Sequence, residues 1–342
     1  MIRTARIASA LSVGTLLVAG CGGSGKATPS TTTANSADSS PSSATSLEQQ
    51  FVAVVRQTQP SVAQIQTDQD LGSGVIFDAN GDIVTNAHVL AGASSIRVTL
   101  ADGRQFPARL VGAYAPDDLA VVSVGTGHAL KPARFGDSSK LQVGEIVLAA
   151  GNPLGLQSSI TDGIVSALGR NVSEGQGVVL PGAIQTSAPI NPGNSGGALV
   201  DLQAQVIGIP TLAAGNPQSG GAAAGIGFAI PSNLVRDIAG QIVRYGRVVQ
   251  SHRAAIGVSV ADSSYRPGAL VVAVQSGGPA DKTGIVPGDS IEAIDGKTVQ
   301  SADDFATLLA TLEPGRTVKL TITRQDGQST TVTATLGKLA GG

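Results

Sequence analysis

Ala188-Pro-Ile-Asn-Pro-Gly-Asn-Ser-Gly-Gly-Ala-Leu199 places one serine, Ser195, among glycines at positions 193, 196 and 197. Glycine tolerates positive φ and a close approach of the backbone, so successive N–H groups can turn towards one point beside the serine oxygen. Such a pocket can stabilise an oxyanion. The same residues suit an exposed glycine-rich loop equally well, so the role of Ser195 depends on the rest of the chain.

Composition limits the kinds of protein that this chain can be. Its 342 residues suggest two domains, and a hydrophobic fraction of 42% beside a charged fraction of 13% allows a sizeable core. A net charge of −2 without a run of Lys or Arg argues against a nucleic-acid partner. Aromatic residues make up only 3% of the chain, so no stacking platform for sugars or bases is evident. The 45 glycines favour many strands and turns.

The N-terminal residues have the pattern of a secretory signal. Arg3 and Arg6 precede an apolar run that is too short to span a bilayer comfortably. Cys21, the only cysteine, follows Val-Ala-Gly, which resembles the bacterial lipoprotein cleavage box. The resemblance implies a signal peptide over residues 1–20 and a lipidated Cys21. The protein would then be exported, anchored by lipid to a cell membrane and facing outside the cytoplasm. An uncleaved anchor and a plain signal peptide are the alternatives.

Short strands dominate the part of the chain that is expected to fold. Residues 21–46, rich in Ser, Thr and Pro, predict a flexible tether, because they cannot bury enough apolar surface to become ordered. Order is expected from Leu47, with a short helix over residues 48–57. Two sets of about six strands follow without intervening helices, which predicts two similar β units, each a barrel or sandwich. The expected strands are 62–66, 74–77, 83–85, 96–99, 109–112 and 119–124, then 145–150, 159–167, 182–186, 198–200, 206–210 and 226–230.

Turn signals divide these strands. Asn80-Gly81 and Asp102-Gly103 predict tight hairpins. Residues 78–82 hint at a calcium loop, but Ile83 stands where that loop needs glycine, so a hairpin is the better prediction.

A helix and a smaller unit complete the chain. The helix is expected to open at Pro231 and to end at Gly246, as a C-terminal glycine should. Residues 47–246 then form one domain, 247–252 a linker and 253–340 a small α+β domain. In that domain Pro279 opens a short helix, and Ser301 caps a longer one with Asp304 as its capping partner. Its expected strands are 255–260, 269–275, 290–294, 318–324 and 330–336.

A serine hydroxyl becomes a strong nucleophile only with a base, and the base needs an acid that fixes its tautomer. Of the three histidines, His128 lies in a turn-like segment and His252 in the linker, whereas His88 follows a strand and precedes an apolar stretch. Each alone is more typical of packing or solvent exposure. Asp118 stands at the mouth of a strand, and Asp117, one residue further out, is expected to be solvated.

The order His88, Asp118, Ser195 discriminates between hydrolase folds. The pattern Gly-x-Ser-x-Gly also marks α/β-hydrolases, but there the serine comes first and lies on a strand-to-helix turn. Here the serine comes last and its surroundings are β, so that alternative fails.

Together these segments closely resemble the HtrA (Deg) serine proteases, a trypsin-like domain followed by one PDZ domain. The similarity runs from about residue 59 to 336. The matching stretches are Gly72-Ser-Gly-Val-Ile76, Thr85-Asn-Ala-His-Val89, Asp118-Leu-Ala-Val121, Gly151-Asn-Pro-Leu-Gly-Leu156, Ile190-Asn-Pro-Gly-Asn-Ser-Gly-Gly197 and Gly225-Ile-Gly-Phe-Ala-Ile-Pro231.

The resemblance implies a fold and a set of roles. The fold is mainly β, a double six-stranded β-barrel followed by the PDZ domain. Ser195 would be the nucleophile, His88 the general base and Asp118 the residue that orients it. Backbone N–H groups of Gly193 and Ser195, with Asn194 between them, would form the oxyanion hole.

Further roles follow from the same resemblance. Ile190 would line a specificity pocket for small or medium apolar residues. The strand that carries Ile226, Gly227, Phe228 and Ala229 would pair with the substrate backbone. Residues 211–225 resemble a mobile activation loop but equally suit a plain surface loop, and Arg170 matches a regulatory relay position or is an ordinary surface arginine. The PDZ carboxylate-binding loop would be Ala255, Ile256, Gly257 and Val258.

The predicted protein is a membrane-tethered endopeptidase that degrades misfolded or damaged envelope proteins and is regulated by peptides in the PDZ groove. We expect no cofactor, no metal ion and no nucleic acid; family analogy implies a homotrimer. The alternative is a non-proteolytic chaperone or peptide-binding adaptor. The chain departs from many relatives at Ser187, where they carry Asp, and at Leu154, where they carry an aromatic residue. It also lacks the long inserted loop of cage-forming members between Asp70 and Gly72.

Overall fold

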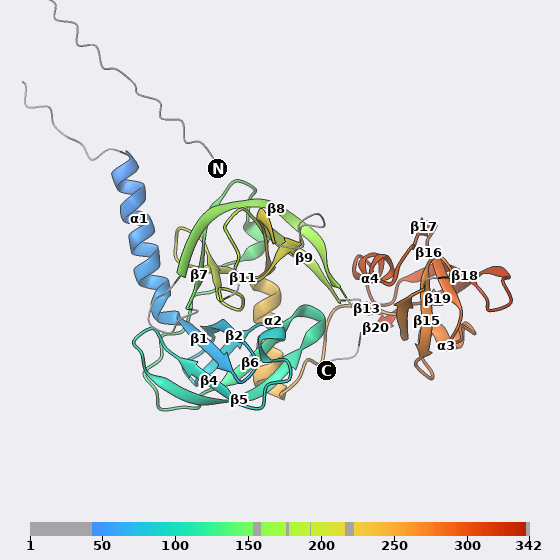
Figure 1. Ribbon diagram of the computed structural model, residues 1–342, viewed down its shortest axis with the longest axis horizontal. Helices are drawn as coiled ribbons and strands as arrows, with labels where there is room; N and C mark the ends of the chain where they lie inside the picture. The colour runs from blue at the N-terminus through green and yellow to red at the C-terminus, as the bar shows by residue number, and fades with distance from the viewer. Residues whose placement is uncertain are drawn as a thin grey trace, which may run out of the picture. The chain divides into compact units, whose positions relative to one another are not determined.

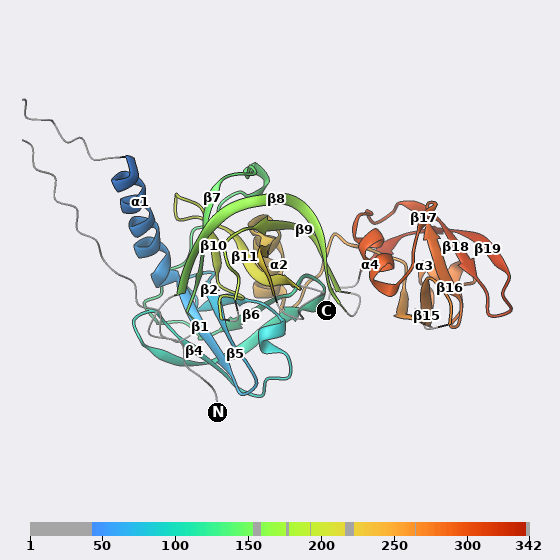
Figure 2. The same cartoon turned by 45° about the horizontal axis from the view of Figure 1, so that its top comes forward.

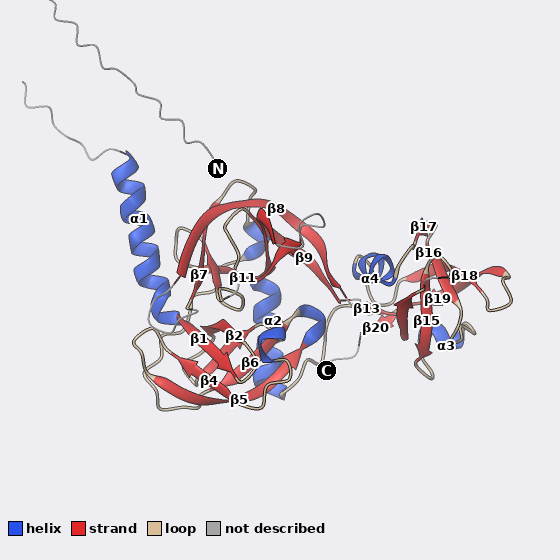
Figure 3. Ribbon diagram, in the orientation of Figure 1, coloured by secondary structure: helices blue, strands red, loops and turns tan. Residues whose placement is uncertain are grey.

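A computed structural model describes residues 43–152, 159–175, 178–191, 193–215, 222–263 and 265–339. These residues fall within one unit of the chain, Ser43–Gly342, whose elements are labelled in Figure 1. Strands are the main secondary structure of this unit (Figure 3). The predicted signal peptide, Cys21 and residues 21–42 of the predicted tether lie outside the described residues.

Six strands close into a first barrel in the order β1-β2-β3-β6-β5-β4, all antiparallel. The two predicted hairpins are present: Gly81 (φ +100°) joins β2 to β3, and Gly103 (φ +85°) joins β4 to β5. A Cβ atom on Gly81 would lie 2.1 Å from the carbonyl oxygen of Gly125, so this turn requires glycine. The strands are β1 (Val62–Thr67), β2 (Leu71–Ile76), β3 (Asp82–Thr85), β4 (Ile96–Thr99), β5 (Gln105–Tyr114) and β6 (Leu119–Ser123).

Six further strands close the second barrel in the order β10-β11-β12-β9-β8-β7. Seen from the view of Figure 2, the long curved strand β8 arches over this barrel. The strands are β7 (Ile146–Gly151), β8 (Ser159–Gly175), β9 (Val178–Thr186), β10 (Ala198–Val200), β11 (Val206–Gly215) and β12 (Ala222–Pro231). The double barrel predicted from sequence is therefore confirmed.

Apolar side chains from both barrels share one core cluster. Leu119 and Val121 of the first barrel belong to it together with Ile209 and Ile230 of the second. Helix α2 (Ser232–Tyr245) buries Val235, Ile238, Ala239 and Ile242 in the same cluster, at the spacing of one helical face. It ends at Gly246 (φ +71°), as predicted, because glycine adopts the left-handed C-cap without strain. The catalytic candidates lie on loops held by this shared core.

The small C-terminal part is a sheet of order β14-β15-β16-β18-β19 with helices α3 (Pro279–Lys282) and α4 (Ala302–Ala310). Phe305 of α4 packs with Ile291, Leu320 and Ile322 of the sheet. Its strands are β13 (Ala254–Ala255), β14 (Val258–Asp262), β15 (Ala269–Val274), β16 (Ser290–Ile294), β17 (Lys297–Thr298), β18 (Thr317–Thr323), β19 (Ser329–Thr335) and β20 (Gly337–Lys338).

One local expectation, the start of the first helix, was wrong, and another, the cap of α4 by Ser301 with Asp304, is confirmed. Helix α1 (Ser43–Thr58) begins before the helix expected over residues 48–57 and includes residues 43–46 of the predicted tether, because a nucleated helix gains a hydrogen bond for each residue it adds. The Ser301 side chain does accept from the Asp304 N–H, at 3.0 Å. The Asp304 carboxylate, however, accepts from the N–H of Gln300 and not from that of Ser301. No helix among the described residues is long and apolar enough to cross a membrane.

Candidate active site

His88, Asp118 and Ser195 each lie at the end of a strand or turn that fixes the backbone around them. His88 opens the short 3-10 helix His88–Leu90 after β3, and Ser195 lies in the turn before β10. Asp118, between a 3-10 turn and β6, has a left-handed backbone (φ +48°). That conformation is uncommon for a non-glycine residue and is typical of functional sites.

The Asp118 carboxylate forms two hydrogen bonds with His88. Its Oδ2 lies 2.8 Å from His88 Nδ1, and its Oδ1 accepts the His88 backbone N–H at 3.0 Å. Because a carboxylate accepts hydrogen bonds, Nδ1 is the nitrogen that carries the proton, and in the neutral imidazole Nε2 then has a lone pair. The Asp118 side chain is 3% exposed whereas that of His88 is 41% exposed, so the acid is sheltered while the base stays open to a ligand.

Thr211 of β11 joins the two halves of this site. Its Oγ1 donates to Asp118 Oδ2 at 2.5 Å, and its carbonyl accepts from Ser195 Oγ at 3.1 Å. Thr211 was not predicted from the sequence as an individual site residue. The sequence does contain a signal for it, because Thr211 carries a hydroxyl within the apolar run 206–212. A hydroxyl that is buried with such a run needs a hydrogen-bond partner.

The turn around Ser195 depends on glycine. Gly193 has φ +105° and Gly196 has φ +78°, values that other residues rarely adopt. The Asn194 N–H donates to the carbonyl of Asn191, and the Gly197 N–H donates to the carbonyl of Asn194. These two bonds close the turn on both sides of the serine.

Asp117 is buried, contrary to the expectation that it is solvated. Its side chain is 1% exposed, and Arg253 Nη1 lies 3.0 Å from its Oδ1. Arg253 also donates to the carbonyls of Pro116 and Val179. Burial raises the pKa of Asp117 to about 6, and the guanidinium of Arg253 opposes that rise. The partner was hidden in sequence because Arg253 lies 136 residues further along the chain.

Ile190 is buried at the predicted specificity position, where it contacts Gly227 of β12. A Cβ atom on Gly227 would lie 2.3 Å from Ile190 Cγ1, so only glycine leaves room there. The predicted pairing of substrate with β12 is wrong for Gly227–Ala229, because these residues already pair with β9 on one side and with β11 on the other. A strand with two neighbours has no free edge.

The remaining candidates are spread over the chain. Arg170 is exposed on β8, opposite Ala183 of β9. His128 packs against Phe106 with ring centroids 4.2 Å apart and the rings tilted by 45°, and His252 Nε2 lies 3.4 Å from Asp237 Oδ2. Residues 211–215 and 222–225 belong to β11 and β12, while residues 216–221 of the predicted activation loop lie outside the described residues, as does Leu154.

In the C-terminal part, Ile256 and Gly257 (φ +80°) form the turn between β13 and β14, together with the flanking Ala255 and Val258. The Ile256 carbonyl accepts from the Ala280 N–H of α3. Strand β14 pairs with β15 and forms the edge of its sheet.

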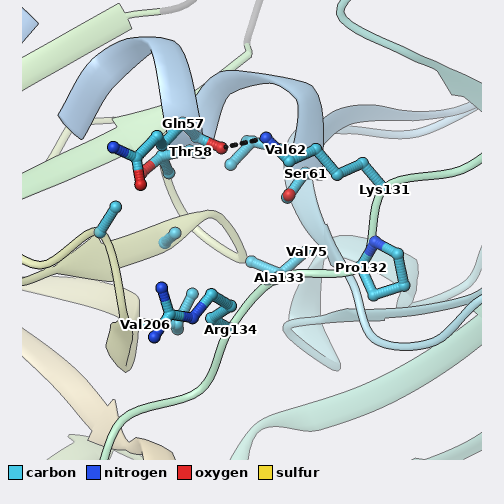
Figure 4. A pocket seen from close by; sticks show the side chains of 12 residues that line it. Gln57, Thr58, Ser61, Val62, Val75, Lys131, Pro132, Ala133, Arg134 and Val206 are labelled. Atoms are coloured by element: carbon cyan, nitrogen blue, oxygen red, sulfur yellow. Dashed lines mark hydrogen bonds between the residues drawn. The ribbon is translucent and has the colours of Figure 1, made fainter. Parts of the chain in front are cut away.

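A separate cavity of about 70 Å³ lies between the end of α1 and the segment 131–134 (Figure 4). Gln57, Thr58, Lys131 and Arg134 line it, and Lys131 Nζ donates to the Gln57 carbonyl at 3.1 Å. None of the three catalytic candidates, His88, Asp118 and Ser195, lines this cavity. Among the described residues, no group of three or more His, Cys, Asp or Glu side chains could hold a metal ion.

An oriented imidazole, a buried carboxylate and a serine in a glycine turn are the components of nucleophilic acyl transfer. Asp118 belongs to the first barrel, whereas Thr211, which bonds to both Asp118 and Ser195, belongs to the second. The site therefore exists only when both barrels are assembled.

Comparison with known proteins agrees with this arrangement. Residues 72–209 match the trypsin-like peptidase domain and residues 254–336 match the PDZ domain. The chain is 41% identical over 315 residues to serine protease PepD of Mycobacterium tuberculosis, covering 86% of this chain and 66% of PepD. It is 39% identical over 282 residues to the periplasmic pH-dependent serine endoprotease DegQ of Escherichia coli K12, covering 79% of this chain and 60% of DegQ. It thus spans less than two thirds of either relative.

Solved structures extend the match. The HtrA-type protease AlgW with a decapeptide superposes with a TM-score of 0.58 at 34% identity, covering 84% of this chain and 98% of that one. The serine endoprotease from Yersinia pestis gives a TM-score of 0.57 at the same identity, and 98% of its chain is covered. The chain therefore belongs to the HtrA family of serine proteases, in which a trypsin-like peptidase domain is followed by a PDZ domain.

Proposed function

We propose that this chain is a serine endopeptidase of the cell envelope that degrades misfolded or damaged proteins. The observation that carries the proposal is the Asp118 carboxylate, which binds both His88 Nδ1 and Thr211 Oγ1. Thr211 in turn accepts the Ser195 hydroxyl. A histidine that a buried carboxylate orients is the base that a serine nucleophile requires, and the bond to Thr211 keeps the Ser195 hydroxyl beside this network.

In the proposed mechanism, His88 Nε2 takes the proton of Ser195 Oγ as that oxygen attacks the scissile carbonyl. The N–H groups of Gly193 and Ser195, with Asn194 between them, stabilise the oxyanion. His88 then returns the proton to the leaving amine, and a water molecule repeats the sequence to release the acyl group. Asp118 holds the histidine tautomer throughout.

Substrate selection is proposed to rest on the wall that Ile190 and Gly227 form. The contact between them leaves an apolar lining, which suits small or medium apolar residues before the cleaved bond. Beyond Pro210, β11 pairs with β12 on one side and with no described strand on the other. The extended substrate is proposed to add there, next to the Thr211 carbonyl that accepts from Ser195.

Regulation by the C-terminal domain is also proposed. Strand β14 is a sheet edge, and Asp262 at its end accepts the first N–H of α4 from Ala302, at 2.7 Å. A peptide strand added between β14 and α4 would bring its carboxylate to the turn formed by Ile256 and Gly257. We propose that such peptides modulate cleavage, with Arg170 in the relay, and that the enzyme assembles as a homotrimer.

Export and lipid anchoring through Cys21 complete the proposal. Fractionation of cells that express the Cys21→Ala variant tests the anchor. The variant should leave the membrane fraction or remain unprocessed. Unchanged processing together with an unchanged membrane fraction contradicts lipidation.

Digestion of β-casein by the mature protein, with Ser195→Ala as the control, tests the peptidase. Wild-type protein should degrade casein, and Ser195→Ala should lose at least about 10⁴-fold of that rate. Equal casein loss in both proteins contradicts the Ser195 assignment. No loss in either, even with an added C-terminal peptide, favours the non-proteolytic adaptor.

A further inference from the structure

Ser73 of β2 occupies a fully buried position against the Ser195 turn, and the proposed mechanism leaves its hydroxyl unused. Its Oγ donates to the Gly193 carbonyl at 2.5 Å and accepts the Asn152 N–H at 2.8 Å. Its backbone N–H donates to the Ser195 carbonyl at 2.9 Å. One residue of the first barrel therefore holds carbonyls on both sides of the Ser195 N–H.

The backbones around Ser73 approach as closely as glycine permits. A Cβ atom on Gly196 would lie 2.3 Å from the Ser73 carbonyl oxygen. A Cβ atom on Gly151 would lie 2.6 Å from Asn194 Cα. Because no side chain separates these backbones, a displacement of Ser73 would displace the backbone of the Ser195 turn as well.

Three consecutive peptide planes of the turn are oriented by hydrogen bonds. The 193–194 peptide is held by Ser73 Oγ at its carbonyl and by the Asn191 carbonyl at its N–H. The 195–196 peptide is held by the Ser73 N–H and, through the Gly196 N–H, by the Pro210 carbonyl.

Between them, the Asn194 carbonyl accepts from the Gly197 N–H. In a planar trans peptide the N–H points opposite to the carbonyl, so the Ser195 N–H is directed away from Gly197.

We propose that Ser73 is a positioning residue that holds the Ser195 N–H in the orientation an oxyanion needs, an inference that rests on the serine-endopeptidase function proposed above. Without the hydroxyl, the Gly193 carbonyl and the Asn152 N–H lose a buried partner. Gly193 has the conformational freedom to let the 193–194 peptide rotate, which misdirects the donor that follows. Ser73 itself does not touch the reacting atoms.

The test compares Ser73→Ala with Ser232→Ala in the full-length mature protein. Ser232 is a matched control, because it is also fully buried and its Oγ also donates to a glycine carbonyl, that of Gly136 at 2.9 Å. It lies at the start of α2, and its hydroxyl bonds to Gly136 and not to the Ser195 turn. Both variants lose a buried hydroxyl, but only one of these hydroxyls contacts the Ser195 turn.

Kinetics are measured with a fluorogenic peptide built on the main β-casein cleavage site. Ser73→Ala should lower kcat about 10- to 100-fold and leave KM within about threefold, because a misplaced oxyanion donor affects the transition state and not substrate binding. Affinity for a peptide aldehyde of the same sequence should fall in proportion to kcat/KM. Ser232→Ala should keep kcat within about twofold of wild type.

A kcat for Ser73→Ala within twofold of wild type, or a loss equal to that of Ser232→Ala, overturns the proposal. If Ser73→Ala does not fold, Ser73→Cys serves instead, since a thiol fits the site but donates weakly. It must then show a reduced kcat at nearly constant KM, and an unchanged kcat refutes the role. Wild-type protein without Ser195-dependent cleavage would instead refute the proposed peptidase function.

Discussion

Asp117 and Arg253 form a buried ion pair directly beside the catalytic acid candidate, with Asp117 Oδ1 3.0 Å from Arg253 Nη1. Asp117 precedes Asp118 in the chain, and Arg253 stands where the linker enters the C-terminal domain. The second carboxylate oxygen of Asp117 is buried and has no hydrogen-bond partner among the described residues. The incomplete pairing explains why burial outweighs the arginine and raises the pKa of Asp117 to about 6.

The raised pKa of Asp117 predicts a pH-dependent stability. The folded carboxyl holds its proton up to about pH 6, whereas an ordinary carboxyl releases it near 3.8. The stabilisation is therefore complete below about pH 4 and is lost as pH rises to 6, by about 3 kcal/mol at most. The Asp117→Asn variant has no carboxyl at this position, so its free energy of unfolding lacks this pH-dependent contribution. Urea unfolding from pH 4 to 7 should show the wild-type free energy falling relative to the variant, and a constant difference contradicts the prediction.

Thr211→Val should weaken catalysis without removing the triad. The substitution keeps the shape of the side chain but deletes the Oγ1 donor to Asp118. A hydrogen bond to a charged group is worth about 1.5–3 kcal/mol, so kcat/KM should fall about 10- to 100-fold. Thr211→Ser retains the donor and should recover most of the rate in the same peptide assay. A valine variant as active as wild type would show that Thr211 is dispensable.

Gly196→Ala should destabilise the fold and abolish cleavage. The added Cβ would lie 2.3 Å from the Ser73 carbonyl oxygen and 2.5 Å from Thr85 Oγ1. Gly92→Ala is the matched control, because Gly92 has a similar φ of +71° but nothing within 4 Å of its Cβ position. It should cost only the left-handed strain, about 1–2 kcal/mol. Thermal unfolding of both variants measures the difference, and equal losses would show that the close approach is easily relieved.

Ile190→Ala should change which bonds are cut. Removing the side chain that contacts Gly227 enlarges the proposed specificity pocket, so larger apolar residues should be accepted before the cleaved bond. Preference between two apolar residues should shift about 10-fold or more, as expected for a change of several methylene groups. Mass spectrometry of β-casein fragments reads the shift. Ile164→Ala, at an exposed position on β8, should leave the fragment pattern unchanged.

Local signals predicted most of the fold. Strand periodicity located all twelve barrel strands, because each strand needs only alternating or apolar residues between turn signals. Gly81 and Gly103 marked their hairpins, and Gly246 marked the end of α2, since these positions need positive φ wherever the chain goes next. The start of α1 at Ser43 was missed, because helix extension depends on an already nucleated turn and not on local composition.

The sequence alone determined the candidates His88, Asp118 and Ser195, because each stands in a short motif whose chemistry can be read locally. Only the tertiary structure decided what holds them. Thr211 reaches Asp118 across 93 residues, Ser73 reaches Gly193 across 120, and Arg253 reaches Asp117 across 136. The first two contacts follow from how the two barrels pack on each other, and the third from where the chain after α2 returns to the first barrel. No local pattern records these contacts, so the residues that orient the site became visible only in the folded chain.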